Sequence, residues 1–226
     1  MKLAIFDFNG TIFPRETLTF LLQQWYHHKY PRRKLIASLT SLLPLFARYK
    51  IQTRTGEDRR RMEIEAVRRF ANIFTGMSRE QIGEFFSLAA ISAEQYFNQQ
   101  IIERIAASKK NNYHTVLLSG AFLPLLVEIG NKLNFDTIIG SELSYNGDIF
   151  DPEYQPKIIS GPAKLDKLKQ VFGDQKIDWE DSCAYADSGH DLFLLEAVGK
   201  PYPVDPDEQL ELLAKEKEWE IIYSKY

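Results

Sequence analysis

Three aspartates that follow apolar runs are the residues best placed to carry chemistry. Asp7 comes directly after the run 3–6, and Asp187 comes directly after the run 183–186, with Asp191 four residues later. Short apolar runs that end in a turn are typical of buried parallel strands, and ligands bind beyond the carboxyl ends of such strands. Carboxylate oxygens are the ligands that a hard cation such as Mg²⁺ prefers. The spacing therefore indicates an acidic site at one edge of a sheet.

Two further motifs lie between these aspartates along the chain. Ser119 follows the apolar run 116–118 and precedes Gly120 and a predicted helix, and Lys164 lies in the first turn of a helix that Pro162 would begin. Each motif alone is common, and a lysine in that position would ordinarily face solvent. The combination in this order carries more weight than any single motif.

The four motifs together resemble those of the haloacid dehalogenase superfamily. The segment 7–11 matches its first motif, Asp-x-Asp-x-Thr, except that the second aspartate is Asn9. The resemblance covers the first 14 residues and the chain from about residue 110 to its end. It is closest to the phosphoserine-phosphatase-like branch, which carries a helical cap between the first two motifs. The resemblance implies a phosphatase or phosphotransferase that acts on a small phosphorylated metabolite.

The resemblance also implies a role for each motif residue. Asp7 would be the nucleophile and would form an aspartyl-phosphate. Mg²⁺ would be held by Asp7, Asp187 and the main-chain carbonyl of Asn9, with Asp191 as a further ligand or as a holder of the metal's waters.

The phosphate would be bound by the two central motifs. The Ser119 hydroxyl and the amides from Gly120 onward, at a helix N-terminus, would contact the phosphate, and Lys164 would neutralise its oxygens. Lys157 is a rival for that lysine role, but no helix begins near it.

Asn9 departs from the family at the position that normally exchanges protons with the leaving group and the attacking water. An amide can do neither, and general acid–base catalysis is typically worth ~10²–10⁴-fold in rate. Three interpretations remain open: an engineered change that traps a complex, a natural protein with slow turnover or substrates with good leaving groups, and a protein that binds phosphorylated ligands without turnover.

Two further residues are candidates for substrate contact. Glu16 lies nine residues after Asp7, where the phosphoserine phosphatases place a glutamate that contacts substrate; a glutamate that stabilises a helix N-terminus is the alternative. His190 lies where these enzymes carry an asparagine beside the phosphate. A core or surface histidine is an equally good interpretation.

Alternating apolar runs and helical patterns predict the fold class. We expect an α/β protein with a Rossmann-like, doubly wound parallel sheet, formed by residues 1–14 and 110–226. Residues 15–109 contain little that indicates strand and are expected to form an inserted all-helical cap. Further expected elements share clear local signals: helices over 17–26, 57–74 and 92–107, a capping box at 78–81, a hairpin turn at 145–148 and an edge strand over 219–223.

Composition and charge restrict the class of protein further. The 226 residues are 44% hydrophobic and 26% charged, as expected for a globular chain, and the apolar stretch 35–46 is too short to span a bilayer. The single cysteine, Cys183, cannot form an internal disulfide and fits a reducing cytoplasm. The chain opens on its first strand, so we expect no signal peptide. The sequence does not indicate an oligomeric state.

The net charge of −3 is unevenly distributed. Residues 29–69 contain twelve basic and four acidic residues, for a net charge of +8, so the remainder carries −11. Arginines 59–61, 68 and 69 have acids at helical spacing, which favours a solvated face. The acid-free run 27–34 could instead attract anionic substrates or rest on an anionic membrane surface. Nucleic-acid binding is not expected, because no recognised motif supports it.

The leading hypothesis is a Mg²⁺-dependent phosphatase acting through Asp7. The alternative is a relative that binds a phosphorylated ligand without efficient turnover. A nucleotide-dependent enzyme on the same type of sheet is disfavoured, because the sequence lacks both the Gly-x-Gly-x-x-Gly and the Gly-Lys-Ser/Thr motifs.

Overall fold

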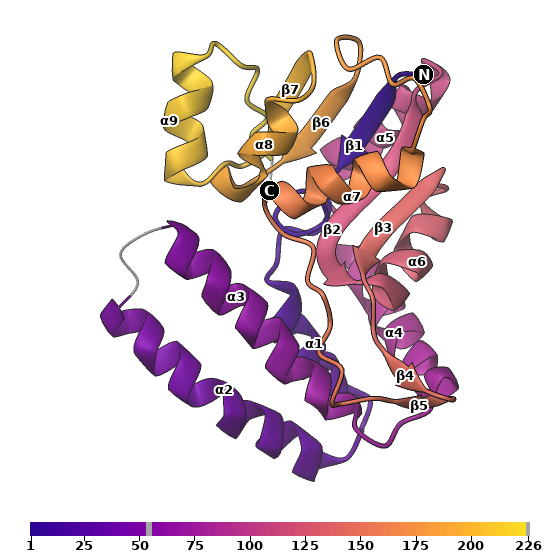
Figure 1. Cartoon of the computed structure of the whole chain (residues 1–226), viewed down its shortest axis with the longest axis vertical. Helices are drawn as coiled ribbons and strands as arrows, with labels where there is room; N and C mark the ends of the chain where they lie inside the picture. The colour runs from indigo at the N-terminus through magenta and orange to yellow at the C-terminus, as the bar shows by residue number, and fades with distance from the viewer. Residues whose placement is uncertain (53–55, 225–226) are drawn as a thin grey trace.

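The computed structural model describes residues 1–52 and 56–224 (Figure 1). The side chains of residues 46, 48–52, 56, 57 and 59 are not described. Part of the basic segment, including Arg54 and the side chain of Arg59, therefore lies outside the described residues.

A five-stranded parallel sheet forms the centre of the protein. Its strands lie in the order β3-β2-β1-β6-β7. Their bounds are Leu3–Phe6 (β1), His114–Phe122 (β2), Thr137–Ser141 (β3), Cys183–Ala186 (β6) and Lys200–Pro203 (β7). The first strand lies in the middle, and successive strands are added outward on both sides of it. This order confirms the predicted Rossmann-like α/β class.

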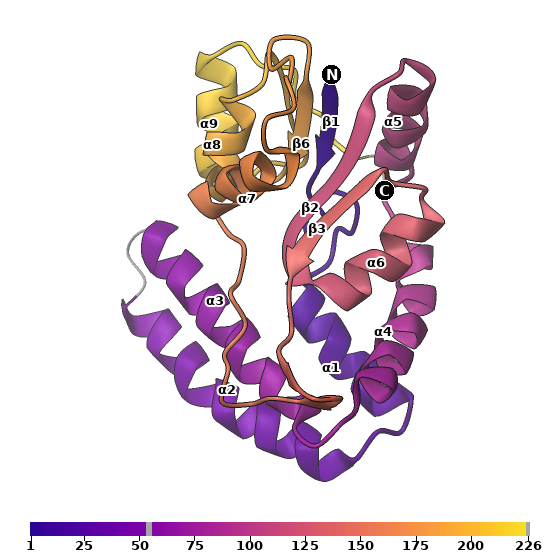
Figure 2. The ribbon, with the colours of Figure 1, turned by 45° about the vertical axis from the view of Figure 1, so that its right-hand side comes forward.

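Helices cover both faces of the sheet (Figure 2). One face packs against α5 (Gln99–Lys110) and α6 (Leu123–Lys132), and the other packs against α7 (Pro162–Phe172), α8 (Leu192–Leu195) and α9 (Glu208–Glu216). Because side chains alternate along a strand, Phe6 lies in the first core and Ile5 in the second. Burial on both faces explains why the strands read as continuous apolar runs.

The region between β1 and β2 is helical throughout its described part from residue 17 to 96, apart from short connections. It contains α1 (Thr17–His27), α2 (Arg32–Gln52), α3 (Gly56–Ala71), the 3₁₀ turn η1 (Asn72–Phe74), α4 (Arg79–Ala93) and η2 (Glu94–Tyr96). Ser78 caps α4 through the predicted capping box with Gln81. Trp25, Phe74 and Phe85 are fully buried against one another in this region. The exact division into core and cap stays a prediction.

A hairpin from the second half of the chain joins this helical region. Strands β4 (Tyr145–Asn146) and β5 (Ile149–Phe150) flank the predicted Asn-Gly turn. Phe150 donates its backbone N–H to Met77 at 2.9 Å, and Arg79 donates to Asp148 at 2.8 Å. The segment 145–150 therefore lies against the start of α4, away from the sheet from which it emerges (Figure 1).

Three expectations about elements are wrong in detail. The helix expected over 92–107 is interrupted, because Asn98 is extended and donates its backbone N–H to Ile12. The helix expected after Ser119 begins only at Leu123, since β2 stays paired with β3 through Phe122 past a bulge. The strand expected over 219–223 is reduced to one bridge with Val204, beyond which Pro206 can donate no ladder hydrogen bond.

Candidate active site

The strand register brings the sequence motifs to one edge of the sheet. Phe6 pairs with Leu117 on one side and with Tyr185 on the other. Asp7 and Asp187 therefore follow the carboxyl ends of the neighbouring strands β1 and β6, and Ser119 lies within β2, two residues beyond the partner of Phe6. Asp7 donates its backbone N–H to the Tyr185 carbonyl at 2.9 Å, which holds it at the end of β1.

Asp7, Asp187 and Asp191 converge at this edge. Each can offer one oxygen to a group in which all the oxygens lie within 4.8 Å of one another. Lys164, in the first turn of α7, reaches into the same cluster. Its Nζ lies 2.9 Å from Asp7 Oδ1 and 2.7 Å from Asp191 Oδ1. The structure thus brings together four of the predicted site residues.

Burial and crowding shift the pKa values of these groups. Asp7 is 4% exposed; loss of solvent raises its pKa to about 6, with Lys164 opposing the shift and Asp191 adding to it. The pKa of Asp187 is raised well above its usual range by burial and by the Asp7 and Asp191 charges. Burial lowers the pKa of Lys164, but the two aspartates beside it more than compensate and raise it overall.

The cluster has the charge that a divalent cation needs, and Gly10 leaves room for one of its carboxylates. Three carboxylates against one ammonium leave two negative charges when all are ionised. Gly10, with φ +70°, lies so close to Asp187 that a Cβ there would be 2.0 Å from Oδ2. A side chain at position 10 would therefore displace the Asp187 carboxylate. All-oxygen donors with this charge fit Mg²⁺.

Asn9 contacts the helical region through its side chain. Its Oδ1 accepts a hydrogen bond from the hydroxyl of Thr17, the buried first residue of α1. The loop beneath is closed by Gly10 N–H to Phe13 O and Phe13 N–H to Phe8 O, both at 2.8 Å. The residue at the departure from the family motif is therefore held in place at the junction with α1.

Ser119 and Gly120 lie on the strand itself. The Ser119 hydroxyl is buried and accepts from the Ala121 amide at 3.4 Å. Gly120 passes so near Ile159 that a Cβ would be 2.8 Å from its carbonyl oxygen. The helix N-terminus expected directly after Ser119 is four residues further on, at Leu123.

Glu16 lies at the start of α1, and His190 lies in the turn that leads to Asp191. Glu16 is exposed and caps α1, since its Oε2 accepts from the Thr19 amide at 2.9 Å. His190 is partly buried in the 3₁₀ turn η3 (Gly189–Asp191), next to Asp191 in the chain. Contact of either residue with a substrate stays a prediction.

Asp207 supports the acidic loop and was missed by the sequence analysis. Its Oδ2 accepts from the Gly189 amide at 3.1 Å, while its Oδ1 caps α9 through the Leu210 amide at 2.9 Å. Its own N–H donates to the Asp187 carbonyl at 2.8 Å. The N-cap position was visible in the sequence, but the contact with the loop 187–189 was not.

Helix α3 approaches the site from the helical region. Arg60 donates to the Ser160 carbonyl at 3.5 Å and Arg68 to the Pro156 carbonyl at 3.4 Å, so α3 lies along the segment that leads into α7. The expected pairing of Arg69 with Glu65 is present at 2.7 Å. Arg60 and Arg68 are only partly exposed and contact the segment 156–160, which differs from the solvated face expected.

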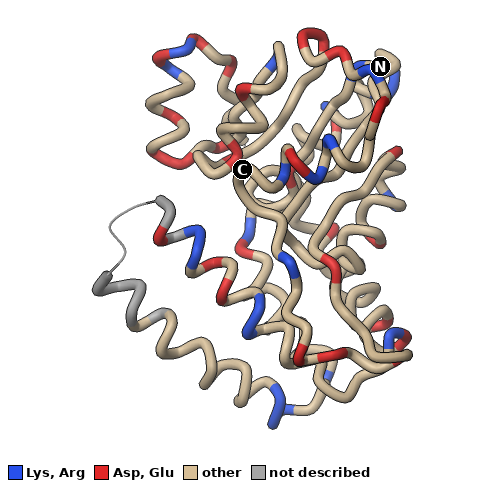
Figure 3. The backbone as a smooth tube through the Cα atoms, in the orientation of Figure 1, with Lys and Arg blue, Asp and Glu red and all other residues tan. Residues whose placement is uncertain are grey.

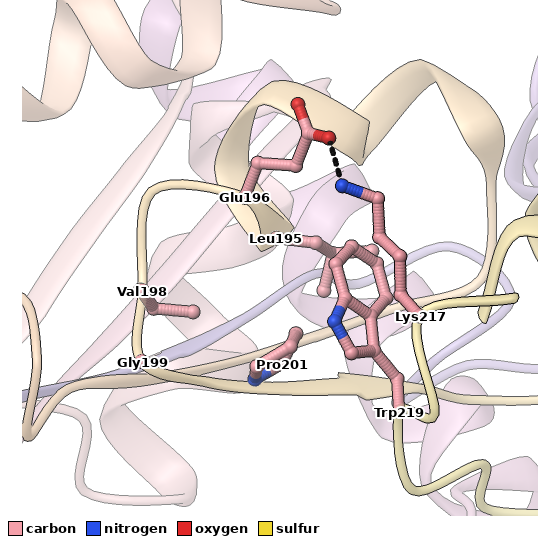
Figure 4. A pocket seen from close by; sticks show the side chains of 7 residues that line it. All are labelled: Leu195, Glu196, Val198, Gly199, Pro201, Lys217 and Trp219. Atoms are coloured by element: carbon pink, nitrogen blue, oxygen red, sulfur yellow. Dashed lines mark hydrogen bonds and ion pairs between the residues drawn. The ribbon is translucent and has the colours of Figure 1, made fainter.

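A surface pocket of about 450 Å³ lies elsewhere (Figure 4). It is lined by Leu195, Glu196, Val198, Gly199, Pro201, Lys217 and Trp219, and Lys217 forms an ion pair with Glu196 at 2.7 Å. Gly199 and Pro201 flank the amino-terminal start of β7, so this pocket is at the opposite end of the sheet from the carboxylates.

The parallel sheet and its cluster of carboxylates with one lysine are those of a hydrolase family. The chain matches the haloacid dehalogenase-like hydrolase family over residues 4–196 and belongs to it. A histidinol-phosphatase of Neisseria meningitidis is 29% identical over 118 residues, which are 49% of this chain and 52% of that protein. The chain spans about half the length, or less, of the curated relatives it matches.

Solved structures share the fold. A protein of unknown function from Bordetella pertussis has a TM-score of 0.79 at 16% identity, with 98% of this chain and 97% of that one covered. A phospho-aspartyl intermediate analogue of phosphoserine phosphatase has a TM-score of 0.59 at 16% identity, covering 99% and 93%. The chain thus shares its fold with solved structures that include phosphoserine phosphatase.

In the part of the chain that the structure describes, no helix is both long and apolar enough to cross a membrane. Cys183 is buried, which raises the pKa of its thiol to about 11, as expected for a cysteine that packs in the core.

Proposed function

We propose that this protein is a Mg²⁺-dependent phosphatase or phosphotransferase that acts on a small phosphomonoester through an aspartyl-phosphate on Asp7. The observation that carries the proposal is the contact of buried Lys164 with both Asp7 and Asp191, which places a cation beside the candidate nucleophile. The relationship to phosphatases agrees with this chemistry.

The roles of the residues follow from their positions. The Asp7 oxygen attacks phosphorus in line, so that a P–O bond to Asp7 forms as the bond to the leaving oxygen breaks. Lys164 offsets charge on the phosphoryl oxygens, and Ser119 orients them. Asp7, Asp187, Asp191 and the main-chain carbonyl of Asn9 would hold the cation. Bound Mg²⁺ would screen the phosphate from the carboxylates and polarise it.

The second step needs proton transfer, and Asn9 limits it. Water attacks phosphorus, the bond to Asp7 breaks, and a base must take a proton from the water. The amide of Asn9 cannot accept that proton, and its Oδ1 already accepts a hydrogen bond from the Thr17 hydroxyl. This contact is the observation that favours the alternative function, binding of a phosphorylated ligand with little turnover.

The experiment is a p-nitrophenyl phosphate assay of the native chain and of Asn9→Asp, with and without Mg²⁺, beside Asp7→Asn. The proposal expects Mg²⁺-dependent release of p-nitrophenol by Asn9→Asp, none by Asp7→Asn, and a phosphate adduct on the Asp7 peptide in the quenched native chain. Absence of turnover and adduct, with phosphate binding retained, would support the binding function. Turnover that survives Asp7→Asn would refute the proposed nucleophile.

The native substrate is the part of the proposal that the helical region would decide. Glu16, at the start of α1, and His190, next to Asp191 in the chain, are candidates for contact with the non-phosphate part of a metabolite. A panel of phosphorylated metabolites tested on Asn9→Asp, with Glu16→Ala beside it, addresses this. A changed ranking of substrates supports contact, whereas an equal loss across the panel assigns Glu16 to capping of α1 alone.

A further inference from the structure

Helix α2 forms the outer edge of the helical region, farthest from the sheet (Figure 1). Its inner face packs on the remaining helices through buried Ser38 and Leu42 and partly buried Leu35. Arg69 of α3 donates to the Ser41 carbonyl at 2.8 Å and fixes the two helices together. The opposite face of α2 therefore points away from the protein.

This outer face presents a row of exposed apolar side chains. Ile36, Leu39 and Leu43 are 61%, 44% and 63% exposed and follow a spacing of three and four residues, which places them in line on one side of the helix. The chain has no charged residue from 35 to 47. Single exposed apolar residues are ordinary, but a continuous row marks an interaction surface.

Basic residues border the apolar row, without acids to neutralise them. Helix α2 begins with Arg32, Arg33 and Lys34, and its sequence contains no Asp or Glu. Lys34 donates to the Thr75 carbonyl at 2.7 Å, whereas Arg32 and Arg33 are exposed. Figure 3 shows basic residues at the start of α2, followed by an uncharged stretch along its described length. Tyr26 is 59% exposed and lies under the Arg32 guanidinium at 5.5 Å. Because the rest of the protein is acidic, this charge pattern favours an anionic partner.

We propose that the outer face of α2, comprising Ile36, Leu39 and Leu43 with the exposed Arg32 and Arg33 at its start, docks on the surface of an anionic lipid bilayer. The helix would lie in the plane of the interface, with the apolar row in the headgroup–acyl boundary and the basic residues at the phosphates. The exposed aromatic ring of Tyr26 suits the same boundary.

Charge argues against a second copy of the chain as the occupant. The sequence of α2 carries cations near both ends, at 32–34 and at Arg48 and Lys50. The sequence of the helix contains no acid that could pair with these cations across an interface between two copies of α2, so a second copy offers no charge complementarity. An anionic bilayer instead offers phosphates to Arg32 and Arg33 at the described start of the helix.

Docking would also orient the site. Helix α2 packs on α3, and α3 contacts the segment 156–161 beside the site. The helical side of the protein, and not α9 or the pocket in Figure 4, would face the bilayer. The inference rests on α2 alone and is independent of turnover at Asp7.

The test is flotation of the full chain with phosphatidylcholine vesicles, with and without phosphatidylglycerol, at low and high salt. A triple variant, Ile36→Ser with Leu39→Ser and Leu43→Ser, removes the apolar row. The matched control is Ile91→Ser with Leu212→Ser and Val171→Ser, whose side chains are 63%, 65% and 45% exposed on other helices. Thermal unfolding of each variant shows that the fold is retained.

We expect salt-sensitive binding to vesicles that contain phosphatidylglycerol, reduced about tenfold or more in the triple variant and unchanged in the control. Arg32→Gln with Arg33→Gln should weaken binding about fivefold for each charge removed. No binding to the anionic vesicles, or equal binding by the folded triple variant, would overturn the inference. So would a dimer in solution that the triple variant dissociates, since the face would then bind a second copy.

Discussion

The Nζ atom of Lys164 lies 2.9 Å from Oδ1 of Asp7, and both side chains are almost completely buried. The contact joins the first turn of α7 to the end of β1, which are far apart in the chain. Lys164 Nζ also lies 2.7 Å from Asp191, so one cation serves two carboxylates. The charges of Asp7 and Asp191 are therefore both balanced by the same lysine.

Replacing Lys164 with Met should strongly destabilise the protein in the absence of divalent cations. Removing one partner of a buried ion pair typically costs about 3–5 kcal/mol, because the remaining charges are left uncompensated. Denaturant unfolding at neutral pH measures this loss. Lys157→Met is the control, since Lys157 is exposed; a similar loss in that variant would contradict the role assigned to Lys164.

Gly10→Ala should abolish stabilisation by Mg²⁺. The added Cβ would be 2.0 Å from Asp187 Oδ2, and the φ of +70° is costly for any residue with a side chain. Gly76→Ala is the matched control, because its φ is +76° and nothing lies within 4 Å of its Cβ position. Both variants should lose about 1–2 kcal/mol from the backbone, but calorimetry should show loss of Mg²⁺ binding only in Gly10→Ala. Equal Mg²⁺ binding by the two would rule out the cation site proposed at Asp187.

Asn9→Asp should raise turnover by ~10²–10⁴-fold on alkyl phosphates, because it restores a group that can exchange protons with the leaving oxygen. The gain should be smaller for p-nitrophenyl phosphate, whose leaving group needs no proton. Steady-state assays on both kinds of substrate give the comparison. If Asn9→Asp is no faster than the native chain on alkyl phosphates, residue 9 is not the proton-transfer position.

Thr17→Val should reduce the gain in turnover that Asn9→Asp produces. The Thr17 hydroxyl donates to the residue 9 side chain and would orient a carboxylate there as it orients the amide. Loss of one such hydrogen bond, worth about 0.5–1.5 kcal/mol, predicts up to about a tenfold fall in kcat of the Asn9→Asp protein. Thr19→Val, an exposed position on the same helix, is the control. An unchanged kcat and pH profile would limit Thr17 to a structural role.

The protein without divalent cations should lose stability as pH rises from about 4 to about 6. The folded pKa of Asp7 is raised from 3.8 to about 6 by burial, so the folded state binds the proton more tightly than the unfolded state and loses that advantage over this interval. Mg²⁺ should stabilise the fold more at about pH 7.5 than at about pH 5, since its ligands must be ionised. Thermal unfolding with and without Mg²⁺ measures both effects. In Asp7→Asn the loss of stability with rising pH should be smaller. If the loss is unaltered, groups other than Asp7 cause it.

The sequence by itself determined the sheet and the edge at which the chemistry lies. Asp7 and Asp187 each end a continuous apolar run, and the carboxyl ends of neighbouring parallel strands must meet. The helix start at Pro162 and the capping box at Ser78 were equally visible, because their signals are local hydrogen-bonding and dihedral preferences.

Only the tertiary structure decided which side chains meet across long intervals of sequence. The contacts of Lys164 with Asp7, Asn9 with Thr17 and Asp207 with the Gly189 amide depend on how α7, α1 and α9 pack, and no spacing rule encodes that packing. The late start of α6 has the same origin, since pairing with β3 outweighs the local helix signal.

The exposed face of α2 also shows what the sequence determined and what tertiary packing decided. The apolar stretch 35–46 was evident in the sequence, but apolar residues occur all round this helix. Periodicity identifies a buried face only when the other face is polar, so the sequence could not say which side of α2 packs. The tertiary structure buries Leu42 and leaves Leu43 exposed, because α3 and α1 cover only one side of the helix.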